Sequence, residues 1–287
     1  MKKQLLLLLL MFICCSAAQS QNSSAVESVV GAEKAFARTA EEKGTKAAFL
    51  QFAADNGLVF NPIPLNAREA WSKRSDNSPL LVWQPAWADA SASGDFGYTT
   101  GPWSMHPKSK ADTATSFGEY VTIWKKQPGG DWKFVLEIGI QHAKPEGDGT
   151  VALQTAPANK YKNSKSEDAN VWRELENEFS TSILKNGLTK TYEKHGSEQI
   201  RLLRQNYFPF VGKKNALKFF QIERMNLKTN ILAGEAASDL AYAYGEYDLI
   251  EQNGKINEGY YLRIWKREPK GWRIALDIQH PFPPGSK

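Results

Sequence analysis

The sequence predicts an α+β protein that consists of two tandem copies of one unit, with the helices of each unit ahead of its strands. Three observations carry this prediction: the composition, a long internal repeat and the order of the elements. The length of 287 residues corresponds to two domains at a typical size of about 150 residues each. Apolar residues make up 41% of the chain and charged residues 23%. These values are typical of a globular protein with a packed core, and they exclude disordered, collagen-like and polytopic membrane chains.

The internal repeat is seen most clearly in two segments that are near copies of each other. Phe117–Pro128 reappears as Glu258–Pro269, and both segments contain Ile-Trp-Lys. Further matches follow in one order along both halves: Glu33 with Glu176, Phe36 with Phe179, Gly44 with Gly187, Asp95–Gly101 with Asp239–Gly245, Trp132–Ile138 with Trp272–Ile278, and the closing pairs Gln141-His142 with Gln279-His280. A period of this length indicates a duplicated domain, because solenoid repeats are much shorter.

The helices are expected at the start of each half. Ser24 and Glu27 have the spacing of a capping box, and apolar residues recur at helical spacing from there to Gly44, which suits a left-handed helix end. A matching apolar stripe precedes Gly187 in the second half. Shorter helices are expected at residues 46–53, 67–73, 189–195 and 215–223.

The strands are expected after the helices. Aromatic and β-branched runs predict strands at Leu80–Ser91, Phe96–His106, Ser116–Lys126 and Trp132–His142, separated by turn residues at Ser93-Gly94 and Gly129–Asp131. Helices followed by strands favour an antiparallel sheet with the helices on one face.

Both faces of that sheet are partly apolar. Strand alternation puts Tyr120, Thr122 and Trp124 on one face and Val121 and Ile123 on the other. We therefore expect the two copies to pack sheet to sheet as an internal pseudo-dimer. Whether the molecule associates further is left open.

The N-terminus resembles a secretory signal. Lys2 and Lys3 precede the apolar run Leu5–Ile13, and the small residues Ser16–Ala18 follow. The run is too short to span a membrane. The predicted organisation is a signal peptide at 1–20, a first domain at 21–145, a linker at 146–166 and a second domain at 167–287, in a periplasmic or secreted protein.

Both cysteines, Cys14 and Cys15, lie inside this segment. A lipoprotein signal has small residues before its cysteine, whereas Phe12 and Ile13 stand here, so lipid attachment is the less favoured alternative. Without it the mature chain has no thiol, which excludes disulfides, cysteine nucleophiles and thiolate metal sites.

Three segments of the first half resemble the nuclear transport factor 2-like (SnoaL-like) superfamily, especially its uncharacterised bacterial branch: Gly94–Gly101, Gly118–Lys126 and Gly130–Phe134. The likeness is weaker in the second half, where Ala241 replaces Gly97. The resemblance implies two tandem cone-shaped α+β barrels, each a curved antiparallel sheet wrapped on a long helix. Their pockets bind small molecules in some relatives and carry isomerase or dehydratase chemistry in others, so the fold alone does not choose the function.

Ketosteroid-isomerase-type relatives place a general-base aspartate just before a proline on the first strand. The equivalent position in this chain is Asn61 before Pro62, and in the second half Phe208 precedes Pro209. An amide cannot accept a proton at neutral pH. Asp55 is the nearest substitute.

The candidate site residues are acids, imidazoles and aromatics. Glu137 with His142, and Asp277 with His280, recur near the end of the last strand, where such a pair serves as acid and base or as metal ligands. The alternative is that a surface carboxylate and a histidine simply end the strand. The catalytic candidates are Glu137, His142, Asp55 and His106. The ligand-binding candidates are Asn61, Tyr98, Trp103, Tyr120, Asp277 and His280.

Other functions lack a signal. The four histidines form no two-ligand helical motif, and there is no nucleophile elbow, phosphate loop or dinucleotide pattern, so neither a metal nor a cofactor is expected. A net charge of +5 is too small to predict a nucleic-acid partner. Three hypotheses remain: small-molecule binding in the first domain, which we favour, an isomerase or dehydratase, and an interaction module without a ligand site.

Overall fold

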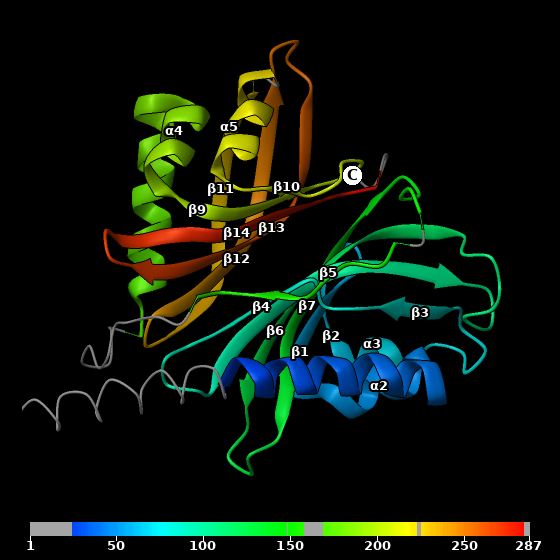
Figure 1. Ribbon diagram of the computed structural model, residues 1–287. Coiled ribbons are helices and arrows are strands. Elements are labelled where there is room, and N and C mark those ends of the chain that lie inside the picture. Colours follow the sequence, from blue (N-terminus) through cyan, green and yellow to red (C-terminus); the bar gives the residue numbers. More distant parts are fainter. Residues whose placement is uncertain (1–24, 148, 158–168, 223–224, 284–287) are drawn as a thin grey trace, which may run out of the picture.

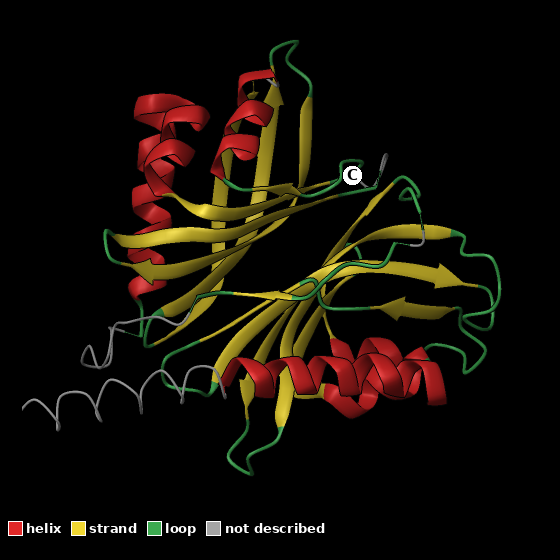
Figure 2. Ribbon diagram, in the orientation of Figure 1, coloured by secondary structure: helices red, strands yellow, loops and turns green. Residues whose placement is uncertain are grey.

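The computed structural model describes residues 25–147, 149–157, 169–222 and 225–283. They form two units, each with helices on its outer side and a sheet that faces the other unit (Figures 1 and 2). The predicted signal peptide with its two cysteines lies outside the described residues. Most of the predicted second half of the linker lies outside them too, so the domain boundary there stays a prediction.

The first domain begins with a helix over residues 25–43. Two short helices follow, α2 (Thr45–Phe52) and α3 (Ala67–Ser72). Its strands are β1 (Ala53–Phe60), β2 (Pro64–Asn66), β3 (Leu80–Trp83), β4 (Trp87–Ala90), β5 (Phe96–His106), β6 (Ser116–Lys126), β7 (Trp132–His142) and β8 (Gln154–Thr155). The sheet has the order β2-β1-β7-β6-β5-β4-β8, with β3 also paired to β5.

The second domain repeats this plan. Its helices are α4 (Val171–His195) and α5 (Lys213–Ile222). Its strands are β9 (Gly196–Arg204), β10 (Phe210–Val211), β11 (Met225–Ala237), β12 (Leu240–Glu251), β13 (Ile256–Glu268) and β14 (Gly271–Pro281). The strand order is β10-β9-β14-β13-β12-β11. Both sheets are open and mainly antiparallel, but β1 with β7 and β9 with β14 run parallel.

The predicted strands β5, β6 and β7 match the structure residue for residue. The expected strand Leu80–Ser91 is instead divided into β3 and β4. Pro85 lies in the gap, where its missing N–H and fixed φ do not suit a continuous ladder. The predicted linker contains β8, whose residues pair in parallel with Trp87 and Ala88 of β4.

The long helix of each domain ends at a glycine with positive φ. Gly44 has φ 88° and separates the helix of residues 25–43 from α2, while Gly187 has φ 77° and kinks α4 at the matching place. The first helix packs Val29, Phe36 and Ala40 onto a core that includes Trp124 and Phe134 of the sheet. The helix therefore lies across one face of the sheet, as predicted.

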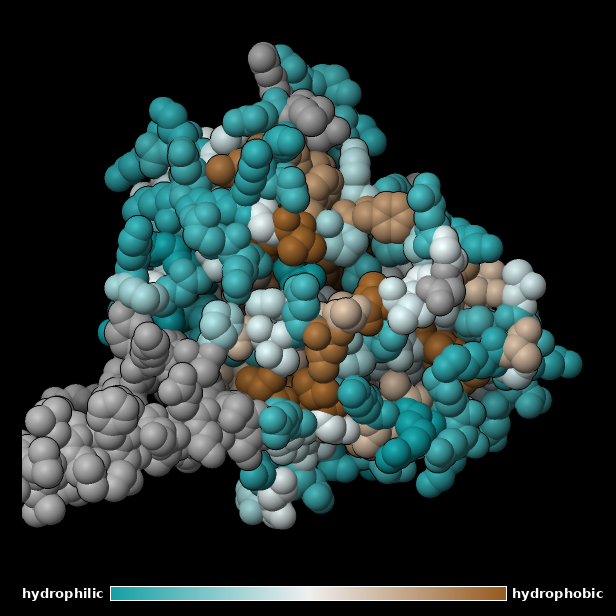
Figure 3. Space-filling model, in the orientation of Figure 1, coloured by the Kyte–Doolittle hydropathy of each residue, from teal (hydrophilic) through white to brown (hydrophobic). Residues whose placement is uncertain are grey.

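The opposite faces of the two sheets pack against each other. Val121 and Ile123 share one buried cluster with Leu262 and Ile264 of the second domain, and apolar side chains gather near the middle of the face seen in Figure 3. The predicted sheet-to-sheet packing is thus present within the chain.

Two lysines join the domains in matching ways. Lys266 is buried and lies 3.1 Å from Asp89 and 3.2 Å from Asp239. Its counterpart in the repeat, Lys125, binds Glu235 on the other domain. Asp89 and Glu235 also correspond, because they stand opposite Tyr98 and Tyr242 in their ladders. The interface is therefore self-complementary, like that of a two-fold dimer.

Candidate functional site

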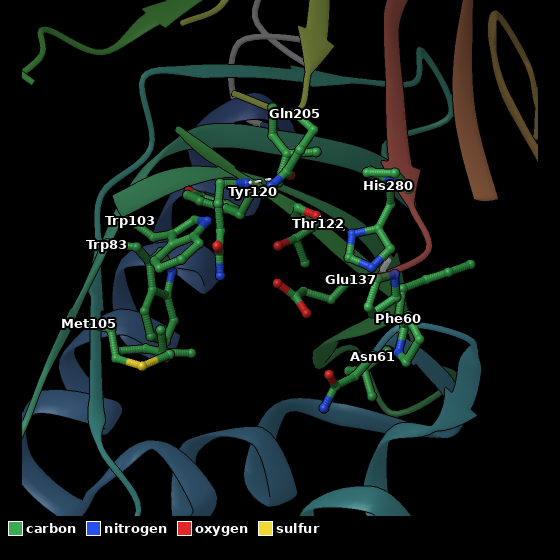
Figure 4. A pocket seen from close by; sticks show the side chains of 18 of the residues that line it. Phe60, Asn61, Trp83, Trp103, Met105, Tyr120, Thr122, Glu137, Gln205 and His280 are labelled. Carbon is green, nitrogen blue, oxygen red and sulfur yellow. Dashed lines mark hydrogen bonds between the residues drawn. The ribbon is translucent and has the colours of Figure 1, made fainter. Parts of the chain in front are cut away.

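A cavity of about 820 Å³ lies in the first domain, between its sheet and helices, and reaches the second domain (Figure 4). Aromatic side chains dominate its wall. They are Phe36, Phe49, Phe60, Trp71, Trp83, Trp103, Tyr120 and Phe282. The polar side chains are those of Asn61, Arg74, Thr122, Glu137, Gln141, Gln205, Asn206, Asn257 and His280.

Strands β6 and β7 build the floor. Their register places Thr122 opposite Glu137 and Tyr120 opposite Gly139, so the side chains of alternate residues point into one space. The absence of a side chain at Gly139 leaves room for the Trp103 indole. An added Cβ there would lie 3.5 Å from the indole nitrogen and only 3.1 Å from the Glu119 carbonyl oxygen. A larger residue at 139 would crowd this wall.

A buried carboxylate on the first helix, that of Glu33, holds two of the tryptophans. Glu33 accepts hydrogen bonds from the indole nitrogens of Trp83 at 2.5 Å and Trp124 at 2.9 Å, and another from Thr99. Burial raises the pKa of Glu33, although these hydrogen bonds oppose the shift. The duplicated glutamate of the repeat is thus a structural group that holds the cavity wall.

Glu137 differs from Glu33 because no hydrogen bond or ion pair joins its carboxyl group to any described residue. The pKa of Glu137 is raised to about 8, mainly by desolvation and to a smaller extent by the Glu33 charge, while Arg74 acts in the opposite direction. The buried hydroxyls of Tyr120 and Thr122 also lack hydrogen-bond partners among the described residues. An aromatic cavity with unsatisfied polar groups is the usual form of a small-molecule site.

The second domain fills the equivalent space with its own side chains. Arg263 stands opposite Asp277 in the ladder, as Thr122 stands opposite Glu137. The guanidinium group of Arg263 lies 2.8 Å from the Asp277 carboxylate and 2.5 Å from the Glu176 carboxylate. The guanidinium group of Arg204 lies 2.7 Å from the Asp277 carboxylate. Burial alone would raise the pKa of Asp277, but the two arginines hold it below the usual value.

The second domain also completes the wall of the first cavity. His280 Nδ1 lies 2.6 Å from the Gly139 carbonyl oxygen, and burial lowers the pKa of this imidazole. The turn after β9 docks beside it, with the Gln141 backbone N–H donating to Gln205 Oε1 at 3.0 Å and that of Asn206 donating to the Gln141 carbonyl at 2.8 Å.

The structure brings five of the predicted site residues together in the cavity. They are Asn61, Trp103, Tyr120, Glu137 and His280. Two predicted ligand-binding residues lie elsewhere. Tyr98 is buried at the domain interface, where its hydroxyl accepts a hydrogen bond from Trp87 at 2.9 Å, because it belongs to the other face of β5. Asp277 forms ion pairs with Arg204 and Arg263 inside the second domain.

The other catalytic candidates do not reach Glu137. His142 is five residues along β7, so strand alternation turns it to the interface, where it lies 3.6 Å from Glu119. Asp55 is exposed, 3.9 Å from Arg68. His106 is buried against Ser104 and the Asp112 carbonyl, at 2.9 and 2.8 Å.

The matched Gln-His pairs are also out of register. Tyr120 faces Gly139 and its counterpart Tyr261 faces Gln279, so the residue equivalent to Gln279 is Gly139 and not Gln141. The two sequence pairs are offset by two positions in the fold. The sequence comparison missed this because each strand carries a Gln-His near its end.

Sequence reasoning did not identify the residues that the second domain contributes from its loops, Gln205, Asn206 and Asn257, nor Arg74. Asn206 follows a strand and has a positive φ of 68°. Asparagine is a common turn residue, so its position after the strand predicts a turn there. Its place beside the other domain's cavity was not predictable.

Among the described residues, no three His, Cys, Asp or Glu side chains gather in a way that would hold a metal ion. No helix within the described ranges is both long and apolar enough to span a bilayer.

No family model matches the chain. No curated protein matches it either. Solved structures do. A ketosteroid isomerase-like protein from Erwinia carotovora atroseptica SCRI1043 is 13% identical, covers 41% of this chain and 98% of its own, and has a TM-score of 0.35. An NTF-2-like protein of unknown function from Shewanella oneidensis MR-1 is 16% identical, covers 37% and 93%, and has a TM-score of 0.33.

A third structure, an NTF2-like protein with a cystatin-like fold from Novosphingobium aromaticivorans, is 12% identical, covers 40% and 81%, and has a TM-score of 0.32. A long first helix lies on a curved, mainly antiparallel sheet, and the first strand pairs in parallel with the last long strand, β7 in the first domain and β14 in the second. Each half of the chain therefore has the α+β arrangement that the resemblance to the nuclear transport factor 2-like superfamily implies.

Proposed function

We propose that the first domain binds a small molecule in its aromatic cavity, and that the second domain is a structural partner that completes the cavity wall. The observation that carries the proposal is the contrast between two equivalent carboxylates. Asp277 is neutralised by two arginines, whereas Glu137 faces open space with no partner among the described residues. Glu137 is half-buried and its carboxyl group opens into the cavity, so a ligand can hydrogen-bond to it without first breaking a contact within the described protein.

The dimensions support this proposal. A volume of about 820 Å³ lies within the roughly 300–1,000 Å³ of typical ligand sites. The aromatic rings offer apolar contact area, and few polar groups converge on the space. Arg74 is exposed, and its guanidinium carbon lies 4.2 Å from the centre of the Trp71 ring. Among the described residues that line the cavity, it is the only lysine or arginine. The third hypothesis, an interaction module without a ligand site, suits the filled second domain better than the first.

Native mass spectrometry tests the proposal, with Thr122→Arg as the comparison variant. This substitution copies Arg263 into the first domain, where the side chain would occupy the space between Glu137 and Glu33 and pair with both. We expect the wild-type protein purified from its producing cells to carry an additional small mass that the variant lacks. A wild-type protein that is found bare and takes up nothing from a cell extract would contradict the proposal.

A second candidate is proton-transfer catalysis of the isomerase or dehydratase kind. It is favoured by the pKa of about 8 at Glu137, which burial produces. A carboxyl group that titrates near neutral pH serves well as a general acid and base. Exchange of deuterium into the position next to a carbonyl, measured over a panel of ketones, is expected to require Glu137. Equal exchange rates in Glu137→Gln would reject this function.

We also propose that the protein is exported. The support is the sequence of residues 1–20, with its basic start, apolar run and small residues. N-terminal sequencing of the mature protein is expected to begin near residue 19 or 21, and an uncleaved chain retained in the cytoplasm would contradict export.

A further inference from the structure

We propose that the ligand is recognised across the domain boundary by two groups, the carboxyl group of Glu137 as donor and Nε2 of His280 as acceptor. The buried end of the ligand is then neutral and planar, and carries both a hydroxyl or N–H group and a carbonyl. This inference rests on the proposed ligand-binding function of the cavity, and it adds the chemistry of the ligand and a recognition residue from the second domain.

The hydrogen bond between His280 and Gly139 fixes the state of the imidazole. A backbone carbonyl only accepts, so Nδ1, at 2.6 Å from it, carries the proton. In a neutral imidazole Nε2 is then an acceptor. Burial lowers the pKa of His280, which favours this neutral form. No described residue hydrogen-bonds to Nε2, and the side chain lines the cavity.

The geometry of β7 brings this acceptor close to Glu137. Gly139 follows Glu137 by two residues on the same face of the strand, a Cα separation of about 7 Å. His280 is anchored on the Gly139 carbonyl, so its ring lies beside the position of Glu137, as Figure 4 shows. Two strands from different domains, β7 and β14, thus hold the two groups at one end of the cavity.

The chemistry of the pair selects the chemistry of the ligand. The protonated carboxyl group of Glu137 donates to a carbonyl oxygen, and His280 Nε2 accepts from a hydroxyl or N–H group. Between these two neutral groups a charged group is disfavoured, because neither of them would act as its counter-ion when it loses its hydration. The rings of Trp83, Trp103 and Tyr120 on the walls favour a planar molecule.

The test uses three probes of similar shape on the full-length protein at pH 6.5. These are 3-hydroxyacetophenone, which presents both groups on one edge of the ring, acetophenone, which lacks the hydroxyl, and 3-ethylphenol, which lacks the carbonyl. Dissociation constants are measured by calorimetry or ligand-observed NMR. We expect 3-hydroxyacetophenone to bind about three- to tenfold more tightly than either of the other probes, the range of one neutral hydrogen bond.

The decisive variant is His280→Asn. The asparagine amide nitrogen takes the place of Nδ1 and preserves the hydrogen bond to Gly139, while the acceptor Nε2 is lost. We expect the hydroxyl preference to disappear in this variant and the carbonyl preference to remain; Glu137→Leu should do the reverse. His142→Asn is the matched control, because His142 lies at the same domain interface but outside the cavity, and it should keep both preferences.

The outcomes separate this inference from the proposed function. Probes that bind the wild-type protein with equal affinity, or a hydroxyl preference that survives His280→Asn, would overturn the inference while leaving ligand binding intact. A protein that retains a cellular ligand in the mass spectrum but binds none of the probes would likewise overturn only the inference. A bare protein that binds no probe and nothing from the extract would overturn both.

Discussion

Thr122 and Arg263 occupy the same place in the two sheets, each directly across the ladder from the carboxylate of the last long strand. The arginine spans the space between Glu176 and Asp277 and stacks on Phe179 at 3.7 Å. The threonine is too short to cross the equivalent space. The arginine therefore occupies, in the second domain, the space that borders the cavity beside Thr122 in the first.

Removal of the arginine is expected to destabilise the second domain. Arg263→Met leaves Glu176 without its ion pair in the core, at a cost of about 3–5 kcal/mol in the free energy of unfolding. Urea denaturation measures the change, and Thr122→Met at the equivalent position of the first domain is the matched control, with a much smaller loss. A loss below 1 kcal/mol for Arg263→Met would show that the cluster is not tightly coupled.

The raised pKa of Glu137 predicts a dependence of stability on pH. The folded protein holds this proton up to about pH 8, whereas the unfolded chain releases it near pH 4.3. The folded state therefore binds more protons between these values, so its stability falls as the pH rises through the interval. The slope for one proton is at most about 1.4 kcal/mol per pH unit.

Glu137→Gln removes this proton equilibrium. We expect the difference in unfolding free energy between the variant and the wild-type protein to shift in favour of the variant from pH 5 to pH 8. Urea denaturation at several pH values measures both profiles. Parallel profiles would mean that Glu137 titrates near its ordinary value in the folded protein.

At the scale of elements, the two long helices show why the repeat is visible in the sequence. Gly44 has φ 88° and ψ 154°, and Gly187 has φ 77° and ψ 169°. Only glycine adopts this region without strain. Because both copies turn the chain at this point, the two glycines match although most of their neighbours differ.

Two alanine substitutions in this region are expected to have opposite effects. Gly44→Ala forces a side chain into positive φ and costs about 1–3 kcal/mol. Gly31→Ala lies inside the helix, where an added Cβ meets nothing within 4 Å, and gains about 0.5–1 kcal/mol of helix stability. Thermal or urea unfolding measures both, and effects of the same sign would contradict the backbone argument.

At the scale of the whole molecule, the two sheets behave as one core. The interface cluster joins strands of both domains, and rings stack across it, with Phe96 and Tyr242 at 5.7 Å between centroids. We infer that the domains unfold together, since separation would expose both apolar faces.

The paired lysines test this coupling. Lys266→Met leaves Asp89 and Asp239 in a buried site without their shared cation, and the expected loss is about 3–5 kcal/mol. The equivalent Lys125→Met is the control; its bridge to Glu235 is more than a third exposed on both sides, so the expected change stays within about 1 kcal/mol. Urea denaturation followed by tryptophan fluorescence measures both, and equal effects would contradict the distinction in burial.

The sequence predicted much of the fold from local patterns. The alternation along β6 separated Tyr120 and Trp124 from Val121 and Ile123, and the structure places these sets in the first-domain core and at the interface. The bounds of β5, β6 and β7 also followed from residue type. Such features depend on neighbours a few residues apart, which the sequence shows directly.

The candidate site was predicted only in part. Glu137, Tyr120, Trp103 and Asn61 lie in the cavity, but the pairing of Glu137 with His142 ignored that residues an odd number apart face opposite sides of a strand. The pseudo-symmetric match of Asp277 to Glu137 was real, yet the two side chains have opposite surroundings.

By itself the sequence determined the duplication, the order of helices and strands and the two faces of each sheet, because these follow from periodicity and turn residues. Only the tertiary structure decided that His280 joins Glu137 and that Arg263 closes the second cone. Both outcomes depend on how the curved sheets and the two domains are placed against each other in space. That placement is set by packing between residues more than a hundred positions apart, such as His280 and Gly139, and no local pattern records it.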